Sequence, residues 1–415
     1  MRQAPPATRL SKAAAYSLHQ DQTLKIQGQA VMALIDTARQ ADEPGGMMAA
    51  GGISALTPFH KILAQLPPAY FGMVMATGIL ALACQFERIP AVPEVLLAIN
   101  VIAYLTLWVL TILRARYHPR QFLADFGNHS RGPGFFATVA ATSVLGTQIA
   151  LQLQMIQLAQ QLWWFAFALW LLLTYAIFTA LTVRRNKPAF EDGINGGWLT
   201  AVVATQSLVV LACAIMPGRP NSEAVMLGLT VLWLAGGMLY IWMISLIFYR
   251  YTFFRFDPQD LTPPYWINMG AMAISTLAGA LLIRVSGQSP LLLSMLPFLK
   301  GLTLLFWATA TWWIPMLVIL GVWRYVYHKL PLTYDPLYWG AVFPLAMYTM
   351  ATHRLAEVFA LPFLFVIPRL FIGLALTAWL LTFLGLAVTV VTSRKRTRAQ
   401  PGAVTTGVPV QVPIN

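Results

Sequence analysis

Five short segments of this 415-residue chain share one pattern, and each begins a long apolar run. Each segment has an aromatic residue in first place, Val or Met in fifth place, and a small residue or Pro in seventh place. The segments begin at residues 70, 135, 198, 265 and 338, so consecutive starts are 63 to 73 residues apart. A repeat of this length made of apolar segments indicates one folding unit used five times.

The apolar runs predict membrane-spanning helices. Of all residues 58% are hydrophobic and 10% are charged, whereas about 25% are charged in an ordinary soluble domain. The runs are too long and too continuous for the alternating strands of a barrel. The sequence therefore predicts an all-α integral membrane protein with ten transmembrane helices, near residues 68–86, 93–113, 134–153, 162–183, 197–216, 224–249, 264–284, 297–323, 337–360 and 365–392.

The repeated segments fall at the starts of the odd-numbered helices. Each repeat is then a helical hairpin, and all five odd-numbered helices run in the same direction. We expect five hairpins with quasi-five-fold symmetry around a central pore. Residues 66–392 would form this domain, between a polar, flexible cytoplasmic tail at 1–65, with a short amphipathic helix near 23–40, and a cytoplasmic tail at 393–415.

The distribution of basic residues predicts the orientation. On the predicted outer side lie six of the 27 Lys and Arg residues, which leaves 21 for the tails and the even-to-odd loops. By the positive-inside rule both termini are cytoplasmic, and we expect a multi-pass protein of the plasma (inner) membrane. The basic residues are scattered among short loops, so no nucleic-acid partner is expected.

The sixth place of the repeat suggests a gate. Five parallel helices with small residues in matching positions leave a hole along their axis. Phe343 is the one aromatic residue in this position, and Pro344 favours a bend directly after it. Phe343 is thus a candidate pore gate, although a core or lipid-facing aromatic residue fits the pattern too. The other sixth-place residues, predicted to line the pore, are Met75, Ala140, Val203 and Gly270.

Hydroxyl groups are the second set of candidate pore-lining groups. Thr77, Thr142 and Thr205 stand in eighth place, and Thr138 and Thr200 lie nearby. They could donate to an anion, or they could bond back to their own helix. The predicted pore contains no acidic residue, and basic inner loops raise the local anion concentration. These features favour small anions as substrates.

Charged residues near the outer end of the ninth helix form a third candidate site. His353, Arg354 and Glu357 could bind an anion or sense pH, or they could form an ion pair at the membrane interface. Arg284 and Arg369 are interpreted as interfacial. Two cysteines are too few for a metal cluster or a disulfide scaffold, so no metal or cofactor is expected. No catalytic motif occurs in any span, so an enzyme is not expected.

The joint pattern of motifs resembles one known family. Phe-Pro in the ninth helix, GFFATVAATSVLGTQ in the third, WLTAVVATQS in the fifth and PYWINMGAMAISTLAG in the seventh resemble the tellurite-resistance/C4-dicarboxylate transporter family. That family includes yeast malate permeases and sulfite exporters and the slow anion channels of plant guard cells. The resemblance covers about residues 66–392. It implies ten helices in five hairpins, an anion pore, a homotrimer in the lipid bilayer, and a gating phenylalanine that corresponds to Phe343.

Two functions remain open. The first is transport of a small anion, such as malate, sulfite, chloride or nitrate, through a phenylalanine-gated central pore. The second is proton-coupled secondary transport or export of dicarboxylate or sulfite, which needs a titratable group. His353 and Glu357 are the candidates for that group.

Overall fold

The computed structural model describes residues 58–216, 222–332 and 334–399, and these are helical with no strand among them. The chain divides into two compact units, Met1–Leu66 with Ile112–Gly127, and Pro67–Thr111 with Asn128–Asn415. The amphipathic helix predicted near 23–40 and most of both predicted tails lie outside the described residues. The last part of the N-terminal tail, predicted to be flexible, is helix α3 (Pro58–Gln65).

Within the described residues, nine helices are long and apolar enough to cross a membrane. They correspond to nine of the ten predicted spans: Pro68–Phe86, Val92–Tyr117, Gly132–Gln152, Ile156–Val183, Gly196–Ile215, Glu223–Phe253, Pro263–Gln288, Leu296–Tyr327 and Pro362–Thr389. The remaining predicted span, 337–360, is also a helix, α15 (Trp339–Phe359). It contains His353, Arg354 and Glu357, which lower its hydropathy, so its crossing of the membrane stays a prediction.

Each odd-numbered helix begins with a 3-10 turn. The turns are η1 (Pro68–Phe71), η3 (Gly132–Phe135), η4 (Gly196–Leu199), η5 (Pro263–Trp266) and η8 (Pro336–Tyr338). The first-place aromatic residue of every repeat lies in its turn. Asp335 is the N-cap of η8: its side chain accepts a hydrogen bond from the Leu337 N–H at 2.7 Å, and Pro336 follows it. Proline at a first helical position lacks only an N–H that would be unpaired anyway.

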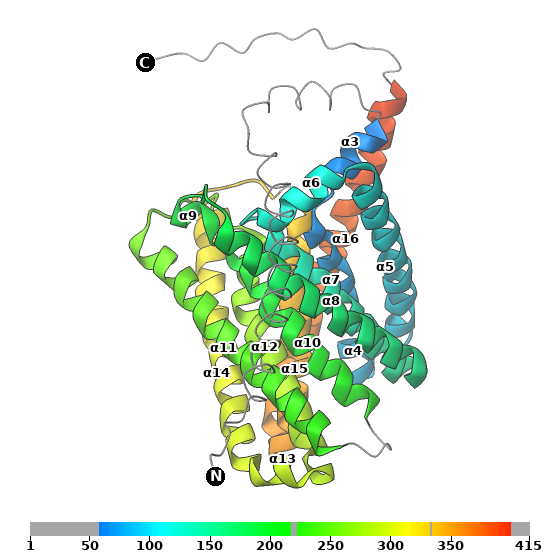
Figure 1. Ribbon diagram of the computed structural model, residues 1–415, viewed down its shortest axis with the longest axis vertical. Coiled ribbons are helices and arrows are strands. Elements are labelled where there is room, and N and C mark those ends of the chain that lie inside the picture. The colour runs from blue at the N-terminus through cyan, green and yellow to red at the C-terminus, as the bar shows by residue number, and fades with distance from the viewer. Residues whose placement is uncertain (1–57, 217–221, 333, 400–415) are drawn as a thin grey trace, which may run out of the picture. The chain divides into compact units, whose positions relative to one another are not determined.

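The five inner helices form a closed cycle. They are α4 (Gly72–Phe86), α7 (Phe136–Gln152), α10 (Thr200–Ile215), α12 (Ile267–Val285) and α15. Each packs against the next, and α15 packs against α4; the five starting turns contact one another in the same cyclic order. Figure 1 shows α10, α12 and α15 side by side in the middle of the second unit, with α11 (Glu223–Phe253) and α14 (Leu296–Val322) flanking them.

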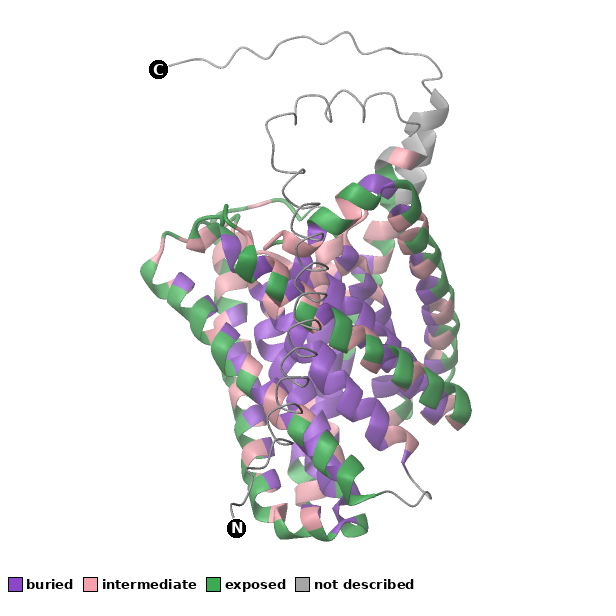
Figure 2. Cartoon of the chain, viewed as in Figure 1, coloured by how far each residue is buried: buried purple, intermediate pink, exposed green. Residues whose placement is uncertain are grey.

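Burial distinguishes inner from outer helices. Four inner spans are 72–89% buried, whereas the five outer spans are 22–33% buried. Figure 2 shows the buried residues gathered along the central helices. The outer helices α8 (Ile156–Val183), α11, α14 and α16 (Val366–Ala399) each pack against the inner helix of their own hairpin and the following inner helix. The packing order follows the predicted hairpins, while rotational symmetry of the five repeats stays a prediction.

Aromatic residues of outer helices hold the following inner helix in position. The indole N–H of Trp170 donates to the Thr205 hydroxyl at 2.9 Å, and that of Trp379 donates to the Thr77 hydroxyl at 2.9 Å. Three further contacts of the same kind join α5 (Val92–Tyr117) to α7, α11 to α12 and α14 to α15: Tyr104 to Thr142, Trp233 to the Ser275 carbonyl, and Trp307 to Thr352. In an apolar surrounding each bond satisfies a polar group that would otherwise be costly to bury.

The first unit is held by a buried arginine. Arg114 Nη2 lies 2.6 Å from Asp125 Oδ2, and both side chains are at most one-tenth exposed. Arg114 Nε also donates to the Ala64 carbonyl at the end of α3, at 3.1 Å. One guanidinium thus ties α3 to the last turns of α5 and to η2 (Asp125–Gly127).

Candidate functional site

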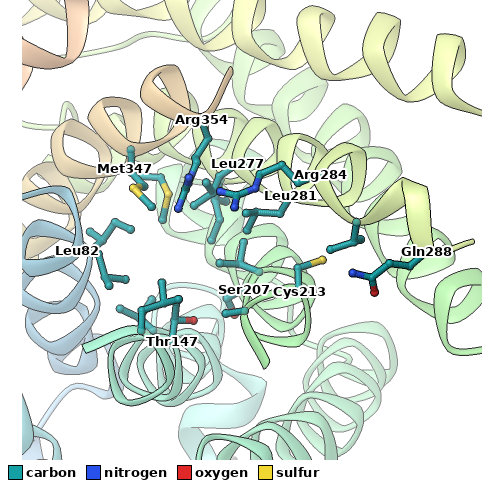
Figure 3. A pocket seen from close by; sticks show the side chains of 18 residues that line it. Leu82, Thr147, Ser207, Cys213, Leu277, Leu281, Arg284, Gln288, Met347 and Arg354 are labelled. Carbon is teal, nitrogen blue, oxygen red and sulfur yellow. The ribbon is translucent and has the colours of Figure 1, made fainter. Parts of the chain in front are cut away.

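A cavity of about 240 Å³ lies between the five inner helices, and each helix contributes residues at the same repeat positions. The tenth-place residues that line it are Ile79, Val144, Ser207, Ile274 and Met347. The thirteenth-place residues are Leu82, Thr147, Val210, Leu277 and Met350. One face of every inner helix is therefore directed at a shared space. Figure 3 shows Leu82, Thr147, Ser207, Leu277 and Met347 around it.

The predicted sixth-place residues lie one helical turn before this cavity. Residues three or four apart share a helix face, so places six, ten, thirteen and seventeen form one stripe. All five sixth-place residues are buried, and none of them lines the cavity. Within the described part of the chain, the cavity thus ends at the layer that contains Phe343.

Phe343 is 1% exposed and is among the largest fully buried side chains. The following residue, Pro344, packs against α12: a Cβ atom built on Gly270 would lie 2.7 Å from Pro344 Cγ. Gly270 therefore lets α12 and α15 approach closely beside Phe343. These contacts are compatible with a plug and with a packed core, so the gating role of Phe343 and Pro344 stays a prediction.

The eighth-place threonines form hydrogen bonds with outer helices and are not among the residues that line the axial cavity. Thr77, Thr142 and Thr205 bond to Trp379, Tyr104 and Trp170 of outer helices. Thr142 and Thr205 also donate to carbonyls four residues earlier. Places six and eight are two residues apart and cannot share a helix face. Their pore-lining role stays a prediction, but we assign their hydroxyls to anchoring the outer helices.

Few polar groups of the cavity are available to a ligand. Thr147 and Ser207 line it, but their hydroxyls donate to the carbonyls of Ser143 and Ala204 at 2.8 and 2.7 Å. Among the described residues that line it there is no Asp or Glu. Its positive charge comes from Arg284 of α12 and Arg354 of α15. Such a lining repels no anion and attracts anions at one end.

The two arginines stand at the mouth of the cavity. They also line a more open hollow of about 580 Å³, together with Ile283, Glu357 and Val358. Arg354 Nη1 donates to Glu357 Oε2 at 2.6 Å, and Arg284 Nη1 lies 3.7 Å from the same oxygen. Figure 3 shows the two guanidinium groups at one side of the cavity. The predicted Arg354–Glu357 pair is present, although the Arg354 side chain is only 10% exposed.

His353 lies between two carboxylates at this mouth. Its Nδ1 is 2.7 Å from Glu87 Oε1, and its Nε2 is 3.5 Å from Glu357 Oε1. The His353 and Glu87 side chains are 14% and 11% exposed. The structure therefore adds Glu87 and Arg284 to the predicted group of His353, Arg354 and Glu357. Extending the sixth-place stripe along α12 in steps of three and four reaches Arg284, so the repeat pattern itself indicates this residue.

These features define a class of protein: a polytopic membrane protein with a cyclic arrangement of buried helices around an axial cavity, suited to passing a solute. Residues 65–387 match the family described as voltage-dependent anion channel (SLAC1), and the chain belongs to that family. Membership implies anion transport and indicates a channel or transporter rather than an enzyme.

Curated relatives agree with this assignment. A protein named uncharacterized transporter from Methanocaldococcus jannaschii is 28% identical over 301 residues, which cover 70% of this chain and 84% of the relative. A second uncharacterized transporter of that organism is 26% identical over 314 residues, with 72% and 86% covered. An uncharacterized membrane protein of Mycobacterium tuberculosis is 37% identical over 148 residues, with 36% and 75% covered.

Proposed function

We propose that this chain passes small anions along the axis of the inner helices, through the cavity, and that Phe343 closes the path at the sixth-place layer. The observation that carries this proposal is the matched lining: equivalent places of all five inner helices surround one cavity, whose described lining residues include two arginines and no acidic residue. A mainly apolar wall with positive charge at its mouth admits an anion without holding it tightly.

The proposed gate depends on position along the stripe. Phe343 lies four residues before Met347, which lines the cavity on the same helix. Opposite it stand the smaller sixth-place residues, so a single ring can block a narrow axis and exclude water from it. Pro344 cannot donate to the carbonyl of Gly340, which weakens the helix at this level and favours a bend.

A second candidate is proton-coupled transport, because a titratable group lies at the mouth. His353 is close to both Glu87 and Glu357, and Glu357 bonds to the cavity-lining Arg354. A proton taken up by this group would alter the charge facing an incoming anion. This candidate predicts that transport depends on a proton gradient, whereas a passive channel does not.

Reconstitution in liposomes tests both candidates. The purified protein would be tested for flux of chloride, nitrate, sulfite and malate, each with and without a proton gradient. Flux of one or more anions in the absence of a gradient supports the passive channel. Flux that requires the gradient supports the coupled carrier. Flux no greater than in protein-free liposomes for every anion would contradict anion transport.

We further propose a homotrimer in the plasma (inner) membrane with both termini cytoplasmic. The outer helices expose large apolar side chains, among them Trp164, Leu172 and Trp242 at 58–64% exposed. Such faces need lipid or another subunit beside them. Cross-linking in native membranes would show whether the protein is a trimer or a monomer.

A further inference from the structure

One carboxylate oxygen at the cavity mouth lies between two guanidinium groups from different helices. Glu357 Oε2 is 2.6 Å from Arg354 Nη1 and 3.7 Å from Arg284 Nη1. Charge-assisted hydrogen bonds and ion pairs with arginine are a common means by which proteins bind carboxylates. Glu357 therefore marks the place where a carboxylate is bound.

Arg354 is held differently from Glu357. The Arg354 side chain is 10% exposed, and its guanidinium lies 3.9 Å from the centre of the Phe86 ring. Its Nε is buried and has no hydrogen-bond partner in the described part of the chain. Glu357, by contrast, has a side chain 37% exposed at the edge of the open hollow. Arg354 is thus held in place by its surroundings, while the Glu357 carboxylate and the Arg284 side chain, which is 45% exposed, both reach solvent.

Among the described residues that line the cavity and the hollow, positive charge exceeds negative charge. Arg284 and Arg354 line both spaces, and of these described residues Glu357 is the one carboxylate that lines either. The carboxylate of Glu87 lies 2.7 Å from His353 instead. A buried guanidinium nitrogen without a partner costs free energy. An added anion would therefore be bound favourably.

We propose that Arg284 and Arg354 form a carboxylate-binding site at the mouth of the anion path, and that Glu357 occupies it as a tethered competitor until a permeating carboxylate displaces it. This inference rests on the proposed function and names a binding site within it. Glu357 keeps the site filled when substrate is scarce. It also favours release, because its carboxylate returns to the arginines as the substrate leaves.

A tethered competitor weakens apparent affinity in proportion to its effective concentration, so its removal should tighten binding by about tenfold. Glu357→Gln keeps the size of the side chain and removes its charge. Arg284→Gln removes one of the two donors and should weaken binding by about tenfold or more. Arg284 is the better arginine to change, because its side chain is 45% exposed and Arg354 is buried.

The test is calorimetric titration of the detergent-purified, full-length protein with succinate, for wild type, Glu357→Gln and Arg284→Gln. Glu94→Gln is the control: Glu94 is exposed in the first turn of α5 and is not among the residues that line the cavity or the hollow, so the change removes the same charge outside the proposed site. We expect tighter binding for Glu357→Gln, weaker binding for Arg284→Gln, and an affinity within twofold of wild type for Glu94→Gln. Thermal unfolding would confirm that each variant is folded.

Equal or weaker succinate binding by folded Glu357→Gln would overturn the tethered competitor. Unchanged binding by Arg284→Gln would overturn the two-arginine site, and so would equal tightening by Glu94→Gln, because the effect would then be general electrostatics. If Glu357→Gln does not fold, the same titration of Arg284→Gln and Glu357→Asp still tests the two-arginine site and the tethered competitor. Anion flux of the wild-type protein in liposomes separately tests the proposed function, since a transporting protein with none of these affinity changes would refute only this inference.

Discussion

At the scale of single residues, the meaning of Phe343 depends on what surrounds its ring. The side chain is 1% exposed, and it continues the stripe that lines the cavity. The ring of a gate adjoins free space into which it can move, whereas a ring in a close-packed core is surrounded by other side chains. The two interpretations predict opposite changes in transport when the ring is removed.

Phe343→Ala should increase anion conductance while the protein stays folded, because the plug is removed from an axial path. Bilayer recordings of the purified variant measure this. The matched control is Phe136→Ala: Phe136 is also 1% exposed, but its ring packs 5.9 Å from that of Phe178 on an outer helix. The control should lose about 3–5 kcal/mol of stability without gaining conductance. Wild-type or lower conductance in folded Phe343→Ala would exclude the gate.

His129 gives a prediction about pH. Burial lowers the pKa of its imidazole below the ordinary 6.5, and the positive charges of Arg184 and Lys187 lower it further. The unfolded chain then binds the proton more readily than the folded chain, so stability should fall as pH drops through 6.5. Thermal unfolding at pH 7.5 and 5.5 should show a smaller decrease for His129→Gln than for wild type. The difference is small because the side chain is half-buried, and an equal decrease in both proteins would refute the assignment.

The site could be predicted from the sequence only in part. Phe343, Met347 and Arg354 follow one helical stripe, so the sixth-place pattern already leads to the cavity and to its charged mouth. The contact between His353 and Glu87 joins residues 266 positions apart, and it depends on how α15 meets the end of α4. Local periodicity contains no information about such a pair.

At the scale of helices, the close approach of α12 and α15 decides the geometry beside Phe343. A Cβ on Gly270 would lie 2.7, 3.0 and 3.2 Å from Pro344 Cγ, Cβ and Cα. Proline is rigid and part of this contact is backbone, so neither helix can yield easily. Helix packing therefore requires a small residue at position 270, whether or not that position also leaves space on the axis.

Gly270→Ala should therefore destabilise the protein by about 1–3 kcal/mol, as overpacking does. Gly301→Ala in α14 is the control, because its Cβ would meet nothing within 4 Å. That substitution should be neutral or stabilise by about 0.5–1 kcal/mol, since alanine favours a helix. Unfolding monitored by circular dichroism compares the two. Equal stability of both variants would contradict the close packing.

At the scale of the whole molecule, the ring of inner helices explains why one cavity receives equivalent residues from five places in the sequence. The starting turns contact one another in the same cyclic order as the helices. Because both the helices and their starting turns form a closed cycle, each helix is fixed in its rotation about its own axis. Its stripe of lining residues then faces the cavity. The repeat predicted the order in which the helices pack. It could not predict which face of each helix was turned inward, because the inner helices are apolar on all sides.

The final prediction concerns orientation, which follows from the basic residues rather than from packing. Lys187 is exposed in the loop between α8 and α10, on the side where the positive-inside rule places the cytoplasm. Gly287 is exposed in η6 (Ser286–Gln288), at the opposite ends of the helices, and its Cβ would meet nothing within 4 Å. A membrane-impermeant maleimide added to intact cells should label Gly287→Cys and leave Lys187→Cys unlabelled until the membrane is opened. The native cysteines Cys84 and Cys213 are buried. Labelling of the wild-type protein measures the background signal from these two residues. Because all inner helices run in parallel, labelling of Lys187→Cys from outside would invert every hairpin and would move the two-arginine mouth to the cytoplasmic side.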